Sequence, residues 1–189
     1  MNDRRDILTP IHKGLQLLMF ETAGALGRSD FSSDAEAREA QRAVERCLEL
    51  LTEHAGHEDR WVAPALERLA PKLASEMDDD HAQLERAAED VAALWPRLEG
   101  ADAPTRLELG GELRHRFDLL LAHHLRHMTW EERDVNAALW AGLTDAELDE
   151  IVAHVVADIG PTHLAEWDAL VFPATNRQEH DARERSSAR

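Results

Sequence analysis

The chain has 189 residues, a length that suits one domain with a sizeable buried core. Its formal net charge of −17 at pH 7 argues against nucleic acid or an anionic membrane surface as the main partner. The single cysteine, Cys47, excludes an intramolecular disulfide and a thiolate zinc cluster, and its helical spacing from Val44 and Leu51 is typical of a small buried hydrophobe.

The residue composition favours helix throughout the chain. Ala, Leu, Glu and Arg dominate, tyrosine is absent, and Val and Ile are few. The N-terminus lacks an apolar signal core, and no apolar run is long enough to span a membrane. We therefore expect an all-α, cytoplasmic protein that binds neither a membrane nor nucleic acid.

The first predicted helix runs from about residue 6 to about residue 27. Apolar residues recur along it at spacings of three and four, and His12 falls on the same stripe as Leu8, Leu15 and Met19. His12 should therefore point toward the core. Taken alone, a histidine on an apolar face is more often a hydrogen-bonded core residue than a metal ligand.

The second predicted helix covers residues 35–69, and Pro64 and Pro71 are expected to kink or fray its end. His54 and Glu58 lie on its inward stripe, where the pattern asks for apolar side chains. A buried ionised carboxylate is strongly unfavourable by itself, so this glutamate needs a partner or a metal.

The third predicted helix covers residues 75–96. Its inward stripe contains His81, and Glu85 follows four residues later. The three aspartates before this histidine, residues 78–80, are interpreted as a solvated first turn that the helix dipole favours. A calcium loop would need a longer alternating pattern of oxygen ligands.

The fourth predicted helix covers residues 102–140 and is expected to loosen near Gly110. His127 and Glu131 lie on its inward stripe, again four residues apart. Four long amphipathic helices joined by short breaks predict an up-down-up-down four-helix bundle over residues 1–142.

Residues 143–175 are predicted to form a C-terminal helical extension that packs on the bundle. A capping box at residues 144–147 opens its first helix, and Gly160 with Pro161 should end that helix before a last helical segment. Residues 176–189 are polar and lack apolar periodicity, so we expect a disordered tail.

The strongest chemical signal is a pair of His-x-x-x-Glu motifs. His54 with Glu58, and His127 with Glu131, are each separated by about one helical turn and project from one face. An imidazole beside a carboxylate suits iron, manganese or zinc, so two such pairs brought together would hold a two-metal site. With inward histidines on the other two helices as well, core packing is a poor explanation, because a metal-free core would have to pair or neutralise several ionisable groups.

The inward polar residues of the four helices form the ordered set His12, His54-x-x-x-Glu58, His81, His127-x-x-x-Glu131. This set resembles the hemerythrin-like, or HHE cation-binding, domain over about residues 5–140. The resemblance implies a four-helix bundle with a non-haem di-iron centre in its core. It also implies that the two glutamates bridge the irons and that the four histidines are terminal nitrogen ligands. Other divalent metals are compatible with the same ligands.

One position departs from the oxygen-carrying members of that family. They have a second histidine four residues after the one that matches His81, and this chain has Glu85 there. As a ligand, Glu85 would replace a neutral nitrogen with an anionic oxygen, which favours the ferric state and argues against reversible oxygen carriage. A Glu85 turned outward would instead leave an iron position open.

Several other polar residues stand near the predicted centre. His57 and His124 are substitutes among the histidine ligands, and Glu132 is an alternative to the glutamate before it. His154 and His163 have no glutamate four residues on, so they are interpreted as surface or packing histidines.

The residues leave three functions to compare. The first is a di-iron protein that binds oxygen, nitric oxide or peroxide, or senses iron or redox state. The second is a di-iron enzyme that reduces oxygen, peroxide or nitric oxide. The third is a metal-poor structural or interaction bundle, which the full set of predicted ligands disfavours. We expect a small gaseous ligand or peroxide as the partner, and a monomer or homodimer.

Overall fold

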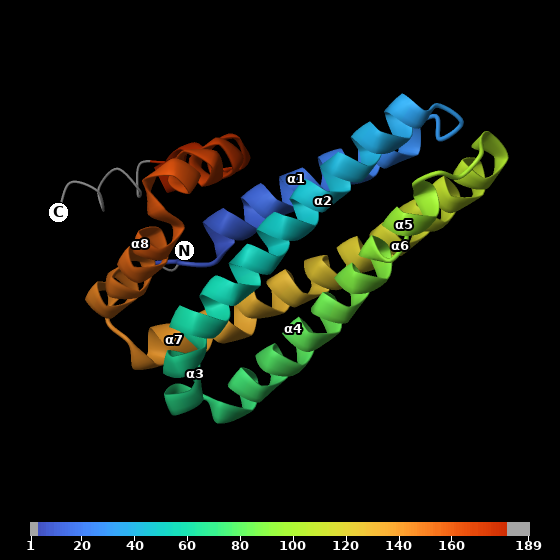
Figure 1. Ribbon diagram of the computed structural model, residues 1–189. Helices are drawn as coiled ribbons and strands as arrows, with labels where there is room; N and C mark the ends of the chain where they lie inside the picture. Colours follow the sequence, from blue (N-terminus) through green and yellow to red (C-terminus); the bar gives the residue numbers. More distant parts are fainter. Residues whose placement is uncertain (1–3, 181–189) are drawn as a thin grey trace. The chain divides into compact units, whose positions relative to one another are not determined.

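The computed structural model describes residues 4–180, which are helical over most of their length and contain no strand (Figure 1). The elements in chain order are α1 (Thr9–Arg28), α2 (Asp34–His57), η1 (Glu58–Val62), α3 (Ala63–Leu69), α4 (Pro71–Ala92), α5 (Trp95–Leu98), α6 (Ala103–Trp130), η2 (Glu131–Val135), α7 (Asn136–Gly142), α8 (Asp145–Val171) and η3 (Phe172–Ala174). Of the η segments, η1 and η2 are π-helical and η3 is a 3-10 turn. Across the described part of the chain, no helix combines the length and apolar character needed to cross a membrane.

The all-α prediction is confirmed, and the predicted helices occur with shifted ends. The second predicted helix is realised as α2, η1 and α3, and the fourth as α6, η2 and α7. The third helix begins at Pro71 and not near residue 75, because proline at the first helical position needs no hydrogen bond from its nitrogen. The expected loosening at Gly110 is absent, since α6 continues through it.

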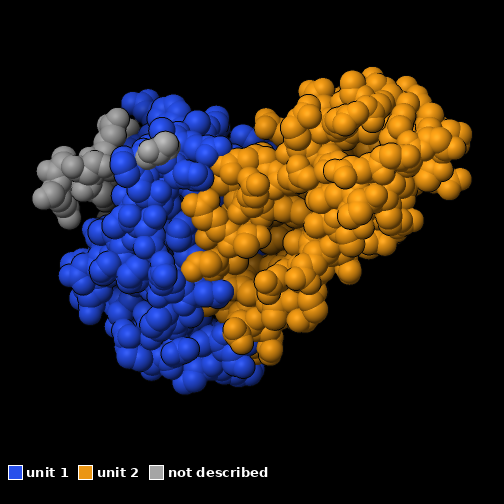
Figure 2. Space-filling view, in the orientation of Figure 1, with its two compact units in different colours: residues 1–17, 57–75, 128–189 blue, residues 18–56, 76–127 orange. Residues whose placement is uncertain are grey.

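The helices divide between two compact units that are not consecutive in sequence (Figure 2). Unit 1 comprises residues 1–17, 57–75 and 128–189, and unit 2 comprises residues 18–56 and 76–127. The extension after residue 142 therefore shares unit 1 with the start of α1 and with the segments that follow the two His-x-x-x-Glu motifs.

Unit 2 is tied together at its loops. Arg106, in the first turn of α6, donates hydrogen bonds to the backbone oxygens of Phe31 and Ser32, in the loop between α1 and α2. It also donates to the backbone oxygen of Ala101, in the loop before α6. The Phe31 ring packs on Gly110, where an added Cβ would lie 2.2 Å from a ring carbon. This close ring contact therefore explains why residue 110 of α6 is a glycine.

Unit 1 contains two copies of one local structure. In each copy a glutamate opens a π-helical turn that continues into a short α-helix, η1 into α3 and η2 into α7. The copies pack on each other, since α3 contacts α7. Equivalent positions of the copies fill the core of the unit, namely Val62 with Val135 and Leu66 with Leu139, all nearly or fully buried.

The N-terminal segment of unit 1 is fastened to the second copy and to the start of α8. Arg4 donates to the backbone oxygens of Trp140 and Leu143 and forms an ion pair with Asp145. Asp6 accepts a hydrogen bond from the buried Asn136 and also accepts from the backbone amides of Leu8 and Thr9, where α1 begins. These contacts fix where α1 begins and therefore fix the position of the residues in its first turns.

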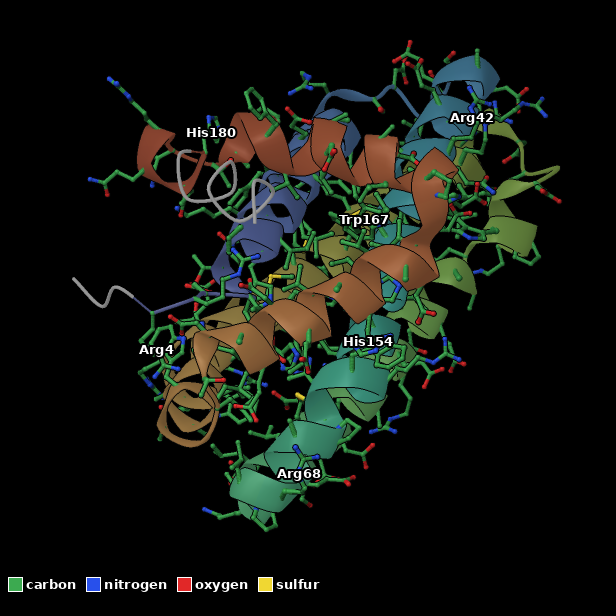
Figure 3. All side chains as sticks on the ribbon, turned by 90° about the vertical axis from the view of Figure 1, so that its left-hand side faces the viewer. Arg4, Arg42, Arg68, His154, Trp167 and His180 are labelled. Carbon is green, nitrogen blue, oxygen red and sulfur yellow. The ribbon has the colours of Figure 1, made fainter. Side chains whose placement is uncertain are left out.

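Helix α8 begins with the predicted capping box, in which Thr144 and Glu147 exchange hydrogen bonds. The helix is interrupted at Gly160, whose φ of 72° lies in the left-handed region that favours glycine, as the predicted break there requires. His154 projects from the first part of α8 in Figure 3 and stacks on Trp61 of η1 at 4.5 Å between ring centroids. The Trp61 indole also donates to Asp158, so α8 packs directly on the turn that Glu58 opens.

The beginning of the expected disordered tail has structure. Asn176 accepts hydrogen bonds from the backbone amides of Gln178 and Glu179, and the turn continues to His180, whose ring stacks on Phe172. Residues 181–189, the rest of the predicted tail, lie outside the described residues.

Candidate metal centre

In unit 1, the buried imidazole of His12 is surrounded by carboxylates. Its Nε2 lies 3.6 Å from an oxygen of Glu58 and 3.5 Å from an oxygen of Glu131. On the other side of the ring, Nδ1 lies 3.1 Å from an oxygen of Glu132. The side chains of His12, Glu58 and Glu131 are all 4% exposed or less. One histidine and two buried glutamates therefore meet in the interior of this unit.

Both buried glutamates stand at the start of π-helical turns. Each glutamate is the first residue of its turn, and its backbone oxygen accepts a hydrogen bond from the amide five residues later, Ala63 for Glu58 and Asn136 for Glu131. A π turn inserts one residue relative to an α-helix and re-aims the side chains that follow. Because the turn occurs at equivalent positions of two copies that pack together, both carboxylates are presented alike.

The charges around His12 decide its protonation. Burial lowers the pKa of this histidine, but the carboxylates of Glu132, Glu58 and Glu131 outweigh burial and raise its pKa to about 10. Near neutral pH, His12 of the metal-free protein is therefore protonated on both ring nitrogens and carries a positive charge. A metal ion bound at Nε2 would take the place of the proton there.

In unit 2, histidines come from three different helices. His54 of α2, His81 of α4 and His127 of α6 are all buried. The rings of His81 and His127 lie 4.9 Å apart between centroids and meet edge to face, at 67° between planes. Neighbouring imidazoles of this kind offer neutral nitrogen ligands that suit iron, zinc or copper.

Asp80 stands at the edge of this histidine group. One of its oxygens lies 3.3 Å from Nδ1 of His127, and the other lies 3.7 Å from Nε2 of His123 and 4.0 Å from the guanidinium of Arg126. Asp80 is 25% exposed, whereas the His127 side chain is 4% exposed. The carboxylate therefore connects a buried imidazole to groups nearer the surface.

His124 has an environment opposite to that of His12. Burial lowers the pKa of His124, and the nearby His127 and His54 lower it further, to about 3. This buried ring is therefore neutral at every physiological pH. The pKa of His123 is also lowered, by burial and then by the charge of Arg126.

Apart from Glu85, every ligand in the predicted set is buried and belongs to a group of histidines and glutamates that could hold a metal ion. Those in unit 1 are His12, Glu58 and Glu131, and those in unit 2 are His54, His81 and His127. Glu85 is exposed and belongs to no such group among residues 4–180. Its exposure agrees with the alternative in which this side chain turns outward. His154 and His163 are exposed, as expected for surface histidines.

Sequence reasoning missed two features of this site. It assigned Asp80 to a solvated first turn, whereas the side chain is partly buried and faces His127. It considered Glu132 only as a replacement for its neighbour, whereas this carboxylate occupies the Nδ1 side of His12. One sequence signal could have found them. Each carboxylate is next to a predicted ligand in the sequence and so lies at the border of the buried stripe.

The donor set fits a metal ion on its own chemistry. Buried carboxylates and imidazoles are the ligands that non-haem iron, manganese and zinc take in proteins, and the described residues contain no thiolate among them. Comparison with family models and with curated proteins gives no match for this chain. The residues themselves therefore carry the argument: an all-helical protein buries groups of histidine and glutamate that could hold a metal ion.

Proposed function

We propose that this chain is a non-haem di-iron protein with an up-down-up-down four-helix bundle of the hemerythrin-like kind. We further propose that it binds a small ligand, namely oxygen, nitric oxide or peroxide, or senses iron or redox state. The observation that carries the proposal is the meeting of His12 with two buried glutamates that open matching π-helical turns. Buried glutamates are rare in a core and are best explained by cations that they bind.

The proposal divides the ligands between two ions. As the resemblance to the hemerythrin-like domain implies, His12, His54, His81 and His127 would be the terminal nitrogen ligands, and Glu58 and Glu131 would be the shared carboxylates. Shared carboxylates reduce the net charge of two nearby cations, which otherwise repel each other strongly in a poorly solvated interior. The exposed Glu85 is left out of the set, so a position that a further ligand would fill stays available to a small molecule.

Iron held by these residues would supply reversible one-electron oxidation. The chain itself supplies orientation and exclusion of water. Met128, Val135 and Leu139, on and beside the turn that Glu131 opens, are each 1% exposed or less. This apolar surrounding limits the site to small ligands and strengthens every electrostatic interaction inside it.

Metal content measured on protein purified from iron-supplemented cells tests the proposal. Two irons per chain are expected, together with a visible absorption spectrum that changes on exposure to oxygen. Reversal of this change when oxygen is removed would favour binding or sensing, and irreversible oxidation with turnover would favour the reducing enzyme.

Two variants test the shared carboxylates. Glu58→Ala and Glu131→Ala should each lower the iron content sharply, whereas His163→Ala, which removes an exposed imidazole 3.9 Å from Glu166, should leave it unchanged. Unchanged iron content in both glutamate variants, with an intact helical spectrum, would refute the shared-ligand assignment.

A further inference from the structure

Two carboxylates outside the proposed ligand set face proposed ligands from behind. Glu132 of η2 lies 3.1 Å from Nδ1 of His12, and Asp80 of α4 lies 3.3 Å from Nδ1 of His127. The first pair belongs to unit 1 and the second to unit 2. In both pairs the carboxylate is partly exposed, at 27% for Glu132 and 25% for Asp80, while the histidine is buried. The same chemical arrangement therefore occurs twice in the molecule, in separate surroundings.

Each of these two carboxylates is adjacent in sequence to a proposed metal ligand. Glu132 directly follows Glu131, and Asp80 directly precedes His81. Each carboxylate is thus attached to the backbone of one proposed ligand while it contacts the ring of another ligand from a different helix. A shift of either helix would change the ring orientation of the contacted histidine, so the contact couples two ligands of each unit in space.

The chemistry of imidazole gives these contacts a direction. A carboxylate accepts a hydrogen bond from Nδ1–H, and this places the lone pair of the neutral ring on Nε2. In His12 it is Nε2 that faces Glu58 and Glu131. An acceptor behind a ligating histidine also raises the basicity of the ring, and loss of such an acceptor typically weakens metal binding by about 10- to 100-fold.

We propose that Asp80 and Glu132 are positioning residues that hold His127 and His12 in the Nδ1–H form, with Nε2 directed at a metal ion. This inference rests on the proposed function, because it presupposes that the two histidines bind metal. The second oxygen of Asp80 faces His123 at 3.7 Å and Arg126 at 4.0 Å.

Binding of Zn²⁺ to the full chain tests the inference, with zinc as a diamagnetic probe. The metal-free protein is titrated against a chromophoric chelator of known affinity. Asp80→Ala and Glu132→Ala should each weaken zinc binding by about 10- to 100-fold. Asp79→Ala is the matched control for Asp80→Ala, and Asp59→Ala is the matched control for Glu132→Ala, because it changes the equivalent position of the first copy. Both remove exposed carboxylates, and neither should weaken binding.

A second readout separates positioning from general loss of structure. Nitrogen-15 NMR of the zinc-loaded protein should show a proton on Nδ1 of His127 and His12, and Asp80→Asn should move the His127 signals while those of His12 stay. Asp80→Asn is nearly isosteric, so it also replaces the alanine variant if that variant does not fold. Its affinity loss should have the same direction and a smaller size.

The outcomes keep the two proposals apart. Tight zinc binding that Asp80→Ala and Glu132→Ala leave at the control level would overturn the positioning role and leave the proposed metal centre standing. Failure of the unaltered protein to bind zinc or iron would overturn both.

Discussion

The two units of this protein bury histidines to a similar depth and give them opposite properties. In unit 1 a single imidazole, His12, faces three carboxylates, and its pKa is raised to about 10 although burial acts to lower it. In unit 2 the buried His124 stands among other imidazoles, and its pKa falls to about 3 because burial and its neighbours act in the same direction. Burial alone therefore does not determine how a histidine titrates. The charge of its neighbours decides.

This difference in protonation affects how each unit would bind a cation. Unit 1 offers buried negative charge already compensated by a proton, so a metal ion would exchange with that proton. Unit 2 holds the buried His124 as a neutral ring, because burial and the neighbouring imidazoles both lower its pKa. The two units thus differ in the donors that they bury, two glutamates and one imidazole among the predicted ligands of unit 1 and three imidazoles among those of unit 2.

The largest expected effect comes from removing the imidazole of unit 1. His12→Leu takes away the cation that Glu58, Glu131 and Glu132 face, and loss of one partner of a buried ionic group costs about 3–5 kcal/mol. His124→Leu removes a neutral ring from unit 2 and should change stability by less than about 1.5 kcal/mol at pH 7. Urea unfolding of the metal-free proteins at pH 7 measures both changes. Equal destabilisation by the two substitutions would contradict the conclusion that His12 is charged and His124 is neutral.

A smaller effect should appear when the pH is lowered. His124 has a pKa near 6.5 in the unfolded chain and about 3 in the folded protein. Above pH 6.5 the ring is neutral in both states, and below it only the unfolded chain gains a proton until the pH approaches 3. The free energy of unfolding therefore decreases over this window through His124.

The His124→Leu variant lacks that contribution. Relative to its own value at pH 7, the variant should lose less stability than the unaltered protein between pH 6.5 and pH 4, as urea unfolding at each pH shows. His115 is a suitable control, because it lies on the same helix and is exposed. A His124→Leu protein that follows the same pH dependence as the unaltered protein would show that His124 does not stay neutral in the folded state.

The burial of the four histidines was predictable, because helical periodicity indicates which side chains face inward. His12, His54, His81 and His127 fell on inward stripes, and all four are buried. Spacing was less informative for the carboxylates. Glu85 follows its histidine by four residues just as Glu58 does, yet it is exposed. Residues four apart differ by about 40° around a helix, so at the border of a buried stripe the spacing does not decide burial.

Features that depend on tertiary contact were not predictable. The π-helical turns that Glu58 and Glu131 open have no local sequence signature, since their extra residue is accommodated by packing between η1–α3 and η2–α7. Helix α6 passes through Gly110 without loosening because the ring of Phe31 packs there, and Phe31 is far away in sequence. Helix propensity predicted a loosened helix at Gly110, whereas the structure places there the ring of a residue that is far away in the sequence.

The smallest expected effect concerns the buried thiol of Cys47. Its accessibility to a labelling reagent reports whether unit 2 unfolds while unit 1 is still folded. Burial raises the pKa of this thiol to about 12, while a hydrogen bond with Thr22 acts in the opposite direction. Since the thiolate is the reactive form, labelling by a disulfide reagent at pH 8 should be very slow in the folded protein and fast in urea. Tryptophan fluorescence reports mainly on unit 1, which contains every tryptophan except Trp95.

The two probes can then be compared along a single urea titration. The midpoint for Cys47 labelling should coincide with the midpoint for fluorescence, because α1 and α2–η1 are continuous helices that contribute residues to both units. A labelling midpoint at clearly lower urea would mean that unit 2 opens first. In that case the three buried histidines His54, His81 and His127 would lie in the less stable unit, and zinc bound to them should raise the labelling midpoint more than the fluorescence midpoint.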